Sequence, residues 1–214
     1  MILSRGRRYL FIHAPKTGGT SMALALEARA MKDDIMLGDT PKAANRRGRV
    51  AGAQTAGRLW KHSTLADLDG LVDGSELDDL FIFTMVRNPW DRMVSYYHWL
   101  RAQTFAHPAA HLAQTLKFGD FIASPVIAQA LAHAPAASYV TDRAGRVRAN
   151  LFIRLEQLAQ DLAPLEAHLG FALCLPHVNR SARCAQYRDA YTQESRAQVA
   201  QMCADDIARF DYRF

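Results

Sequence analysis

Lys16 and a run of small residues lie where a short apolar segment, residues 9–13, gives way to a helix-forming stretch. Gly18 and Gly19 have no Cβ atoms, so the turn between the two segments can point successive backbone N–H groups into one concavity. The lysine ammonium, two hydroxyls and the positive end of the helix dipole add to this cradle. We predict an anion-binding loop here, with an ordinary turn and a solvated lysine as the alternative. The predicted ligand-binding residues are Lys16, Thr17, Gly18, Gly19, Thr20 and Ser21.

A second anion site is predicted after the apolar run 80–86, which has the unbroken hydrophobicity of a strand buried on both faces. Arg87 ends this run and can grip a phosphate with its guanidinium fork. A helix should follow, since Asn88 can cap it and Pro89 suits its first position. Ser95, about two turns into that helix, could reach the same group. Two anion sites at neighbouring strand ends indicate one ligand with two separated phosphate-like ends.

The elements that would position these residues alternate between strands and helices. A third apolar run, residues 150–154, leads into one leucine-striped helix over 155–169, and a last helical element starts near Gln193. Residues 33–61 have the composition of a long loop. The alternation predicts an α/β fold of three layers around a mostly parallel sheet, with the ligand beyond the carboxyl ends of the strands.

Composition supports one domain over residues 1–214, because half of the residues are hydrophobic and can fill one core. The three cysteines are widely spaced, which argues against a disulfide framework or a zinc site, and no cluster has metal-ligand spacing. The longest apolar run is too short for a bilayer-spanning helix. We therefore predict a cytoplasmic protein without a metal. The net charge of +5 is weak evidence for any partner, but arginines outnumber lysines 21 to 5. Because the planar guanidinium group suits phosphate and sulfate, this excess favours a nucleotide or polyanion ligand.

Ordinary nucleotide triphosphatases are disfavoured. Their G-x-x-x-x-G-K-S/T pattern is absent, because Lys16 precedes the glycines here, and no G-x-G-x-x-G fingerprint occurs in the chain.

Two segments together resemble a known family. Pro15-Lys-Thr-Gly-Gly-Thr-Ser21, followed by Val86-Arg-Asn-Pro-x-x-Arg-x-x-Ser95, is similar to the paired signature of sulfotransferases that use 3′-phosphoadenosine 5′-phosphosulfate (PAPS). The likeness is greatest to the branch containing bacterial proteins and heparan-type uronosyl 2-O-sulfotransferases. Segments 154–158, 176–181 and 210–214 resemble further landmarks of the family. The resemblance implies a P-loop-like fold and PAPS as the donor.

The same resemblance implies roles for individual residues. Residues 16–21 would hold the 5′-phosphosulfate, and Arg87 and Ser95 would hold the 3′-phosphate. The family pattern also suggests that the polar stretch with Ser181 and Arg183 closes over the 3′-phosphate, although it could equally be a plain surface loop.

Sulfuryl transfer builds charge on the departing phosphate oxygen, and we expect Lys16 to stabilise it. His62 is the candidate base for the acceptor proton, because imidazole titrates near neutral pH and the Lys61-His-Ser-Thr64 segment is similar to the base-bearing segment of the branch. His13 is the competing candidate, and a purely structural role for His62 is the alternative.

The predicted function is in-line transfer of the PAPS sulfuryl group to a hydroxyl, with a saccharide or small polar acceptor and neither nucleic acid nor membrane as a partner. The arginines of residues 46–58 could line the entrance for an anionic acceptor or simply keep a loop hydrated. The alternatives are a P-loop-like ATP-dependent kinase and a non-catalytic polyanion-binding protein. The sequence leaves the acceptor and the oligomeric state open.

Overall fold

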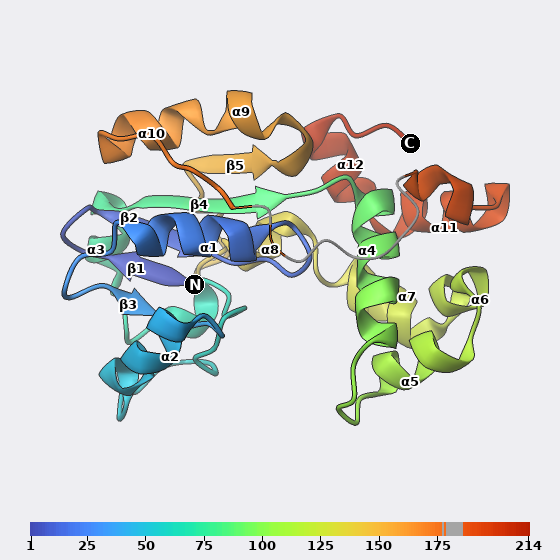
Figure 1. The fold of residues 1–214 in the computed structure, drawn as a ribbon, viewed down its shortest axis with the longest axis horizontal. Helices are drawn as coiled ribbons and strands as arrows, with labels where there is room; N and C mark the ends of the chain where they lie inside the picture. The colour runs from blue at the N-terminus through green and yellow to red at the C-terminus, as the bar shows by residue number, and fades with distance from the viewer. Residues whose placement is uncertain (177, 179–185) are drawn as a thin grey trace. The chain divides into compact units, whose positions relative to one another are not determined.

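One five-stranded mixed sheet organises the fold in the computed structural model, which describes residues 1–176, 178 and 186–214 (Figure 1). The strand order is β3-β1-β2-β4-β5. The strands are β1 (Ile2–Ser4), β2 (Tyr9–Ile12), β3 (Ile35–Met36), β4 (Phe81–Val86) and β5 (Leu151–Arg154).

The three strands predicted from the sequence, β2, β4 and β5, run parallel. β2 pairs with β4 and β4 pairs with β5 in parallel, with Ile12 opposite Thr84 and Val86 opposite Arg154. Their carboxyl ends therefore meet at one edge of the sheet, where ligands of α/β proteins bind. This confirms the predicted α/β fold with parallel central strands. The sequence analysis missed β1 and β3, and both pairings of β1 are antiparallel.

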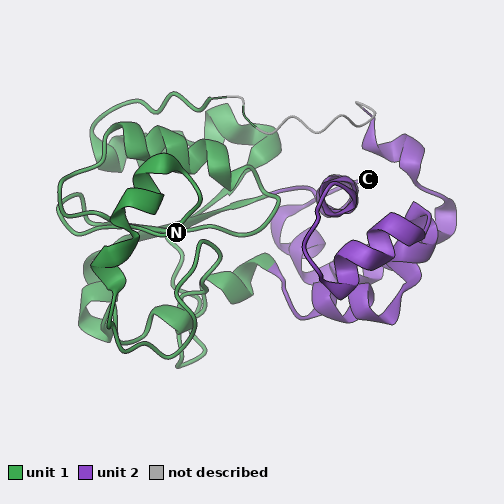
Figure 2. Ribbon diagram, turned by 60° about the horizontal axis from the view of Figure 1, so that its bottom comes forward, with its two compact units in different colours: residues 1–86, 136–178 green, residues 87–135, 179–214 purple. Residues whose placement is uncertain are grey.

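The chain divides into two compact units, residues 1–86 with 136–178 and residues 87–135 with 179–214 (Figure 2). The whole sheet belongs to the first unit. Single-domain organisation over 1–214 stays a prediction, since packing density alone does not define a folding unit.

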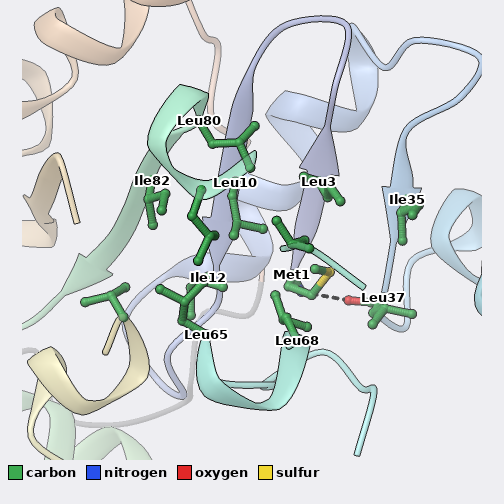
Figure 3. Packing of buried hydrophobic residues seen from close by; sticks show 13 residues of the cluster. Met1, Leu3, Leu10, Ile12, Ile35, Leu37, Leu65, Leu68, Leu80 and Ile82 are labelled. Atoms are coloured by element: carbon green, nitrogen blue, oxygen red, sulfur yellow. Dashed lines mark hydrogen bonds between the residues drawn. The ribbon is translucent and has the colours of Figure 1, made fainter. Parts of the chain in front are cut away.

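Each face of the sheet in the first unit has its own hydrophobic cluster. Leu10 and Ile82 face a cluster that includes Leu65, Leu68 and residues of α3 (Figure 3). Because side chains alternate along a strand, Phe11 and Phe83 face the opposite cluster, together with residues of α1 and α10. The sheet is thus flanked by helices on both faces, as predicted. The helices of this unit are α1 (Gly19–Ala28), α2 (Pro41–Arg46), α3 (Gly74–Asp79), α8 (Ala136–Tyr139), α9 (Leu158–Asp161) and α10 (Ala163–Leu169), with 3₁₀ turns η1 (Arg47–Val50), η2 (Ala66–Leu68) and η3 (Leu155–Gln157).

The described residues of the second unit are helical and pack around aromatic side chains such as Trp90, Tyr97 and Phe121. The cap predicted at Asn88 is confirmed, because its side chain accepts a hydrogen bond from the Trp90 amide at 3.1 Å. The elements are α4 (Pro89–Arg101), α5 (Pro108–Thr115), α6 (Phe118–Ala123), α7 (Pro125–Ala132), η4 (Tyr187–Ala190), α11 (Gln193–Met202) and α12 (Ala204–Phe210).

The prediction of one long loop over 33–61 is wrong, because this segment contains β3, α2 and η1. The Arg46 and Arg49 guanidinium groups donate to the main-chain oxygen of Asp34, at 3.3 and 2.7 Å. These two arginines therefore stabilise the segment internally. Whether the arginines of residues 46–58 line an entrance or keep the surface hydrated stays a prediction.

Two helix predictions were too long. The segment 155–169 forms η3, α9 and α10 instead of one helix, and Pro164 lies in the first turn of α10, where its missing N–H is tolerated. The C-terminal element is two helices, α11 and α12, that meet at Cys203.

No helix in the described ranges combines the length and apolar character that a membrane crossing demands. The predicted cytoplasmic location stays a prediction.

Truncating the centre of the sheet should strongly destabilise the protein. Phe83 is fully buried and its ring stacks on Phe11 at 5.2 Å, so we expect Phe83→Ala to lower the free energy of unfolding by about 3–5 kcal/mol. Urea unfolding followed by circular dichroism measures this loss. The control is Phe105→Ala, whose side chain is 47% exposed and should cost about 1 kcal/mol or less. Equal losses for the two variants would contradict the central position of Phe83.

Candidate functional site

The loop between β2 and α1 has an unusual backbone at two of the predicted ligand-binding residues. Lys16 has a φ of +64° and Gly18 a φ of +87°. The left-handed region is rare for a lysine, and such local strain is typical of functional loops. A Cβ on Gly18 would also lie 2.9 Å from Leu155 Cδ1. Conformation and space both require glycine at residue 18.

The side chain of Thr17 braces this loop from within. It is 2% exposed, and its hydroxyl donates to the Ala14 carbonyl at 2.8 Å. Gly18 is the N-cap of α1; no side chain of the described residues caps this helix, and its first turn holds no acidic residue. The first N–H groups of a helix lack intrahelical acceptors and carry the positive end of the dipole. The start of α1, with Thr20 and Ser21, is therefore suited to an anion.

A line of direct contacts joins the start of α1 to His62. A Cβ on Gly19 would lie 2.2 Å from His13 Cδ2, so the His13 ring packs on the glycine Cα. The main-chain oxygen of His13 accepts a hydrogen bond from His62 Nδ1 at 2.7 Å, and the two rings meet edge-on with centroids 4.7 Å apart. The Trp60 ring follows, 5.0 Å from that of His62 and perpendicular to it. The structure thus brings the candidate base to the predicted anion loop.

His62 has the protonation state that a base requires. A carbonyl oxygen can only accept, so Nδ1 carries the hydrogen and Nε2 of the neutral ring carries the lone pair. Burial lowers the pKa of His62 to about 4; the hydrogen bond to His13 raises it, and the positive charge of Lys61 lowers it further. Burial also holds the pKa of His13 well below its usual value.

The turn that carries His62 is firmly held. Ser63 is fully buried; its hydroxyl donates to the Arg58 carbonyl at 2.9 Å and accepts from the Trp60 amide at 2.8 Å. The Lys61 carbonyl accepts from the Met1 nitrogen at 2.8 Å, and the Lys61 ammonium pairs with the Asp39 carboxylate. Sequence reasoning proposed His62 but missed these contacts; the two made by Lys61 join residues far apart in the chain.

Arg87 directly follows β4, and its guanidinium contacts Asp91 one helical turn later. The distances to Asp91 Oδ2 are 2.7 Å from Nε and 2.6 Å from Nη2, and the exposed fractions of the two side chains are only 11% and 18%. Asp91 therefore orients the arginine, a role that the sequence analysis missed. Ser95 lies on α4 and is 6% exposed.

Ser181 and Arg183 lie outside the described residues. Within the described ranges, no three His, Cys, Asp or Glu side chains gather in a way that could hold a metal ion. The absence of a metal stays a prediction.

No protein-family model matches the chain. No curated protein matches it either. A solved structure does, that of mouse sulfotransferase SULT7A1 complexed with PAP. The match covers 98% of this chain and 87% of that one, with a TM-score of 0.51 and 15% sequence identity. At this identity the likeness concerns the fold alone, which is sulfotransferase-like.

His62 should stay neutral well below the pH at which an ordinary histidine protonates. In the ligand-free protein we expect a titration midpoint at about pH 4, with the hydrogen on Nδ1, because burial penalises the charged ring. Nitrogen-resolved NMR measures both properties when the titration runs from pH 8 to below pH 4, and His62→Gln assigns the signal. The folded state would then bind fewer protons than the unfolded one between pH 4 and 6.5, so His62 makes stability rise with pH across that window. A midpoint near 6.5 would contradict the buried setting.

Proposed function

We propose that this protein transfers the sulfuryl group of PAPS to an acceptor hydroxyl. The observation that carries the proposal is the line of contacts from Gly19 through His13 to His62, which joins an anion-suited helix start to a neutral imidazole. The sulfotransferase fold supports it, since the matched structure aligns with nearly the whole chain.

In the proposed donor complex, the loop holds the 5′-phosphosulfate through the Lys16 ammonium, the amides at the start of α1 and the Thr20 and Ser21 hydroxyls. The inward-facing Thr17 side chain makes its amide, not its hydroxyl, the group offered to the ligand. Arg87 and Ser95 are proposed to hold the 3′-phosphate, with Asp91 orienting the guanidinium. Their role, like that of Ser181 and Arg183, rests on the sequence resemblance.

The acceptor oxygen attacks sulfur in line with the bond that breaks. A new sulfur–oxygen bond forms while the bond between sulfur and the bridging phosphate oxygen breaks, and that oxygen leaves with the electron pair as part of 3′,5′-adenosine bisphosphate (PAP). The proton of the acceptor hydroxyl moves to Nε2 of His62. Lys16 stabilises the charge that grows on the departing oxygen.

The chemical class of the acceptor is also a proposal. A saccharide hydroxyl, as in the heparan-type branch, is favoured by the resemblance around Lys61 and His62. A phosphate-transferring kinase would use ATP and would gain nothing from a 3′-phosphate. Calorimetric titrations with PAP and with ATP therefore separate the two proposals: we expect PAP to bind at least tenfold more tightly, because only PAP offers two phosphate ends. Tighter binding of ATP would overturn the sulfotransferase proposal.

Removing the Lys16 charge should slow the chemical step. We expect Lys16→Ala to lower turnover by about 10²–10³-fold, the usual cost of losing one donor at a developing charge. Transfer of radiolabelled sulfate from PAPS measures it. Lys32→Ala is the matched control, because Lys32 is exposed and lies beyond α1. A non-catalytic polyanion binder would lose little on either substitution.

Removing the base should impair turnover without impairing donor binding. His62→Gln keeps an amide that can donate to the His13 carbonyl but has no basic nitrogen, so we expect turnover to fall about 10²–10⁴-fold while PAP affinity stays within about threefold. Kinetics and calorimetry on the same preparation measure the two effects. The exposed His111 provides the control substitution. If His13→Gln abolished turnover and His62→Gln did not, the base would be His13.

A further inference from the structure

Segment 211–214, which follows α12, is hydrogen-bonded to the residue after Arg87. The Asn88 side chain donates to the main-chain oxygen of Arg213 at 2.8 Å, across 125 positions of the chain. We infer that this segment, anchored by Phe214, positions Arg87 for the 3′-phosphate of the donor. Phe214 is then a positioning residue that acts through Asn88. The inference rests on the proposed function and adds to it a residue that sets the geometry of the donor site.

The first argument is the anchoring of the Phe214 ring. It lies nearly perpendicular to two other aromatic rings, with centroid distances of 5.6 Å to Trp90 and 5.4 Å to Tyr191. The guanidinium carbon of Arg196 lies 4.5 Å from the centroid of the same ring. Edge-to-face contacts and a cation over the ring both favour one arrangement of these side chains. The ring therefore fixes the end of segment 211–214.

The second argument is that the same neighbours also hold the start of α4. Trp90 is 4% exposed and lies in the first turn of this helix. Its indole N–H donates to the Arg196 carbonyl at 3.0 Å, and its own carbonyl accepts from the Tyr191 hydroxyl at 2.9 Å. The Phe214 ring and the first turn of α4 are thus held by one set of contacts.

The third argument is the place of Asn88 between Arg87 and the segment. The Asn88 side-chain oxygen accepts from the Trp90 amide at 3.1 Å, while its nitrogen donates to Arg213. Asn88 is 7% exposed and directly follows Arg87, so these two bonds fix the backbone from which the arginine side chain extends. Asp91 fixes the other end, the guanidinium. An arginine held at both ends binds a phosphate with little loss of conformational entropy.

The experiment compares two nucleotides that differ in the 3′-phosphate, PAP and adenosine 5′-monophosphate (AMP). Calorimetry, with competition against PAP for AMP, gives both dissociation constants for the full-length wild-type chain and for Phe214→Ala, Phe214→Tyr and Asn88→Ser. Serine also caps helices well, but it lacks the amide nitrogen that donates to Arg213. Asn88→Ser thus breaks the link at its other end and decides the matter if Phe214→Ala does not fold, which circular dichroism shows.

Two control variants belong to the same unit. Arg213→Ala removes a side chain that is 85% exposed and keeps the main-chain oxygen that Asn88 contacts. Phe105→Ala removes an aromatic ring that is 47% exposed.

We expect Phe214→Ala and Asn88→Ser each to weaken PAP binding about tenfold, because an arginine that is free to move loses entropy on binding. AMP binding should stay within about twofold, since AMP has no 3′-phosphate for Arg87 to hold. Phe214→Tyr, which keeps the ring, should bind PAP nearly as the wild type does, and so should both controls. In an Arg87→Gln background, Phe214→Ala should cause no further loss of PAP affinity, because both substitutions remove the same interaction.

A general structural effect would give a different pattern. Equal losses for PAP and AMP in Phe214→Ala, or losses that add to those of Arg87→Gln, would overturn the inference. Unchanged PAP binding in Phe214→Ala or in Asn88→Ser would overturn it as well. An equal loss in Arg213→Ala would assign the effect to the charge of that side chain and not to positioning.

The inference and the proposed function fail separately. If the wild-type chain binds PAP but the variants behave in one of these contrary ways, the role of Phe214 is overturned and the donor assignment stands. If the wild-type chain does not bind PAP, the proposed function falls and the inference falls with it.

Discussion

The hydrogen bond from His62 Nδ1 to the His13 carbonyl is the interaction on which the candidate site depends. It joins two residues that are 49 positions apart in the chain: His13 directly follows β2, and His62 lies in the turn before η2. This one bond sets the tautomer of the imidazole, fixes the ring beside His13, and holds it in a setting where burial keeps it uncharged. Without it, the candidate base would be one more histidine on a turn, with neither a defined lone pair nor a defined distance from the predicted anion loop.

The parallel strands impose a second constraint, because they bring the segments that follow β2 and β5 to the same edge of the sheet. Gly18 shows how closely these segments pack: the space for a Cβ is taken by Leu155, at the start of the 3₁₀ turn that follows β5. Gly19 is constrained in the same way by the His13 ring. The two glycines are thus required by conformation in one case and by close approach in both. The loop that should bind the anion is held by neighbours on either side before any ligand arrives.

Much of this arrangement could be predicted from local sequence signals. Lys16 with paired glycines, Asn88 and Pro89 at a helix start, and the unbroken apolar run before Arg87 each report on a few consecutive residues. The failures have two kinds. Pro164 is a local signal for a helix boundary, but the prediction of one helix over 155–169 followed the leucine spacing instead. β3 and α2 could not be predicted from the sequence, because segments of two and six residues show little periodicity. These elements are stabilised by contacts such as those of Arg46 and Arg49 with Asp34. The same holds at the site: the contact between His13 and Gly19 depends on how β2 enters α1, which no residue pattern encodes.

A pKa of about 4 makes the imidazole of His62 a weak base in the ligand-free protein, and a bound anion would change this. The ring is uncharged near neutral pH because burial and the Lys61 charge both oppose protonation. In the proposed complex, the negative charge of the bound donor would oppose both effects. One negative charge about 5 Å from the imidazole, at the effective dielectric constant of about 20 that describes protein sites, stabilises the protonated ring by about 3 kcal/mol, or about two pKa units. The pKa would then approach the ordinary histidine range only in the complex, where the proton has to be taken up. Burial thus keeps the ring of the ligand-free protein neutral, and in the proposed complex the charge of the donor would raise its affinity for the proton.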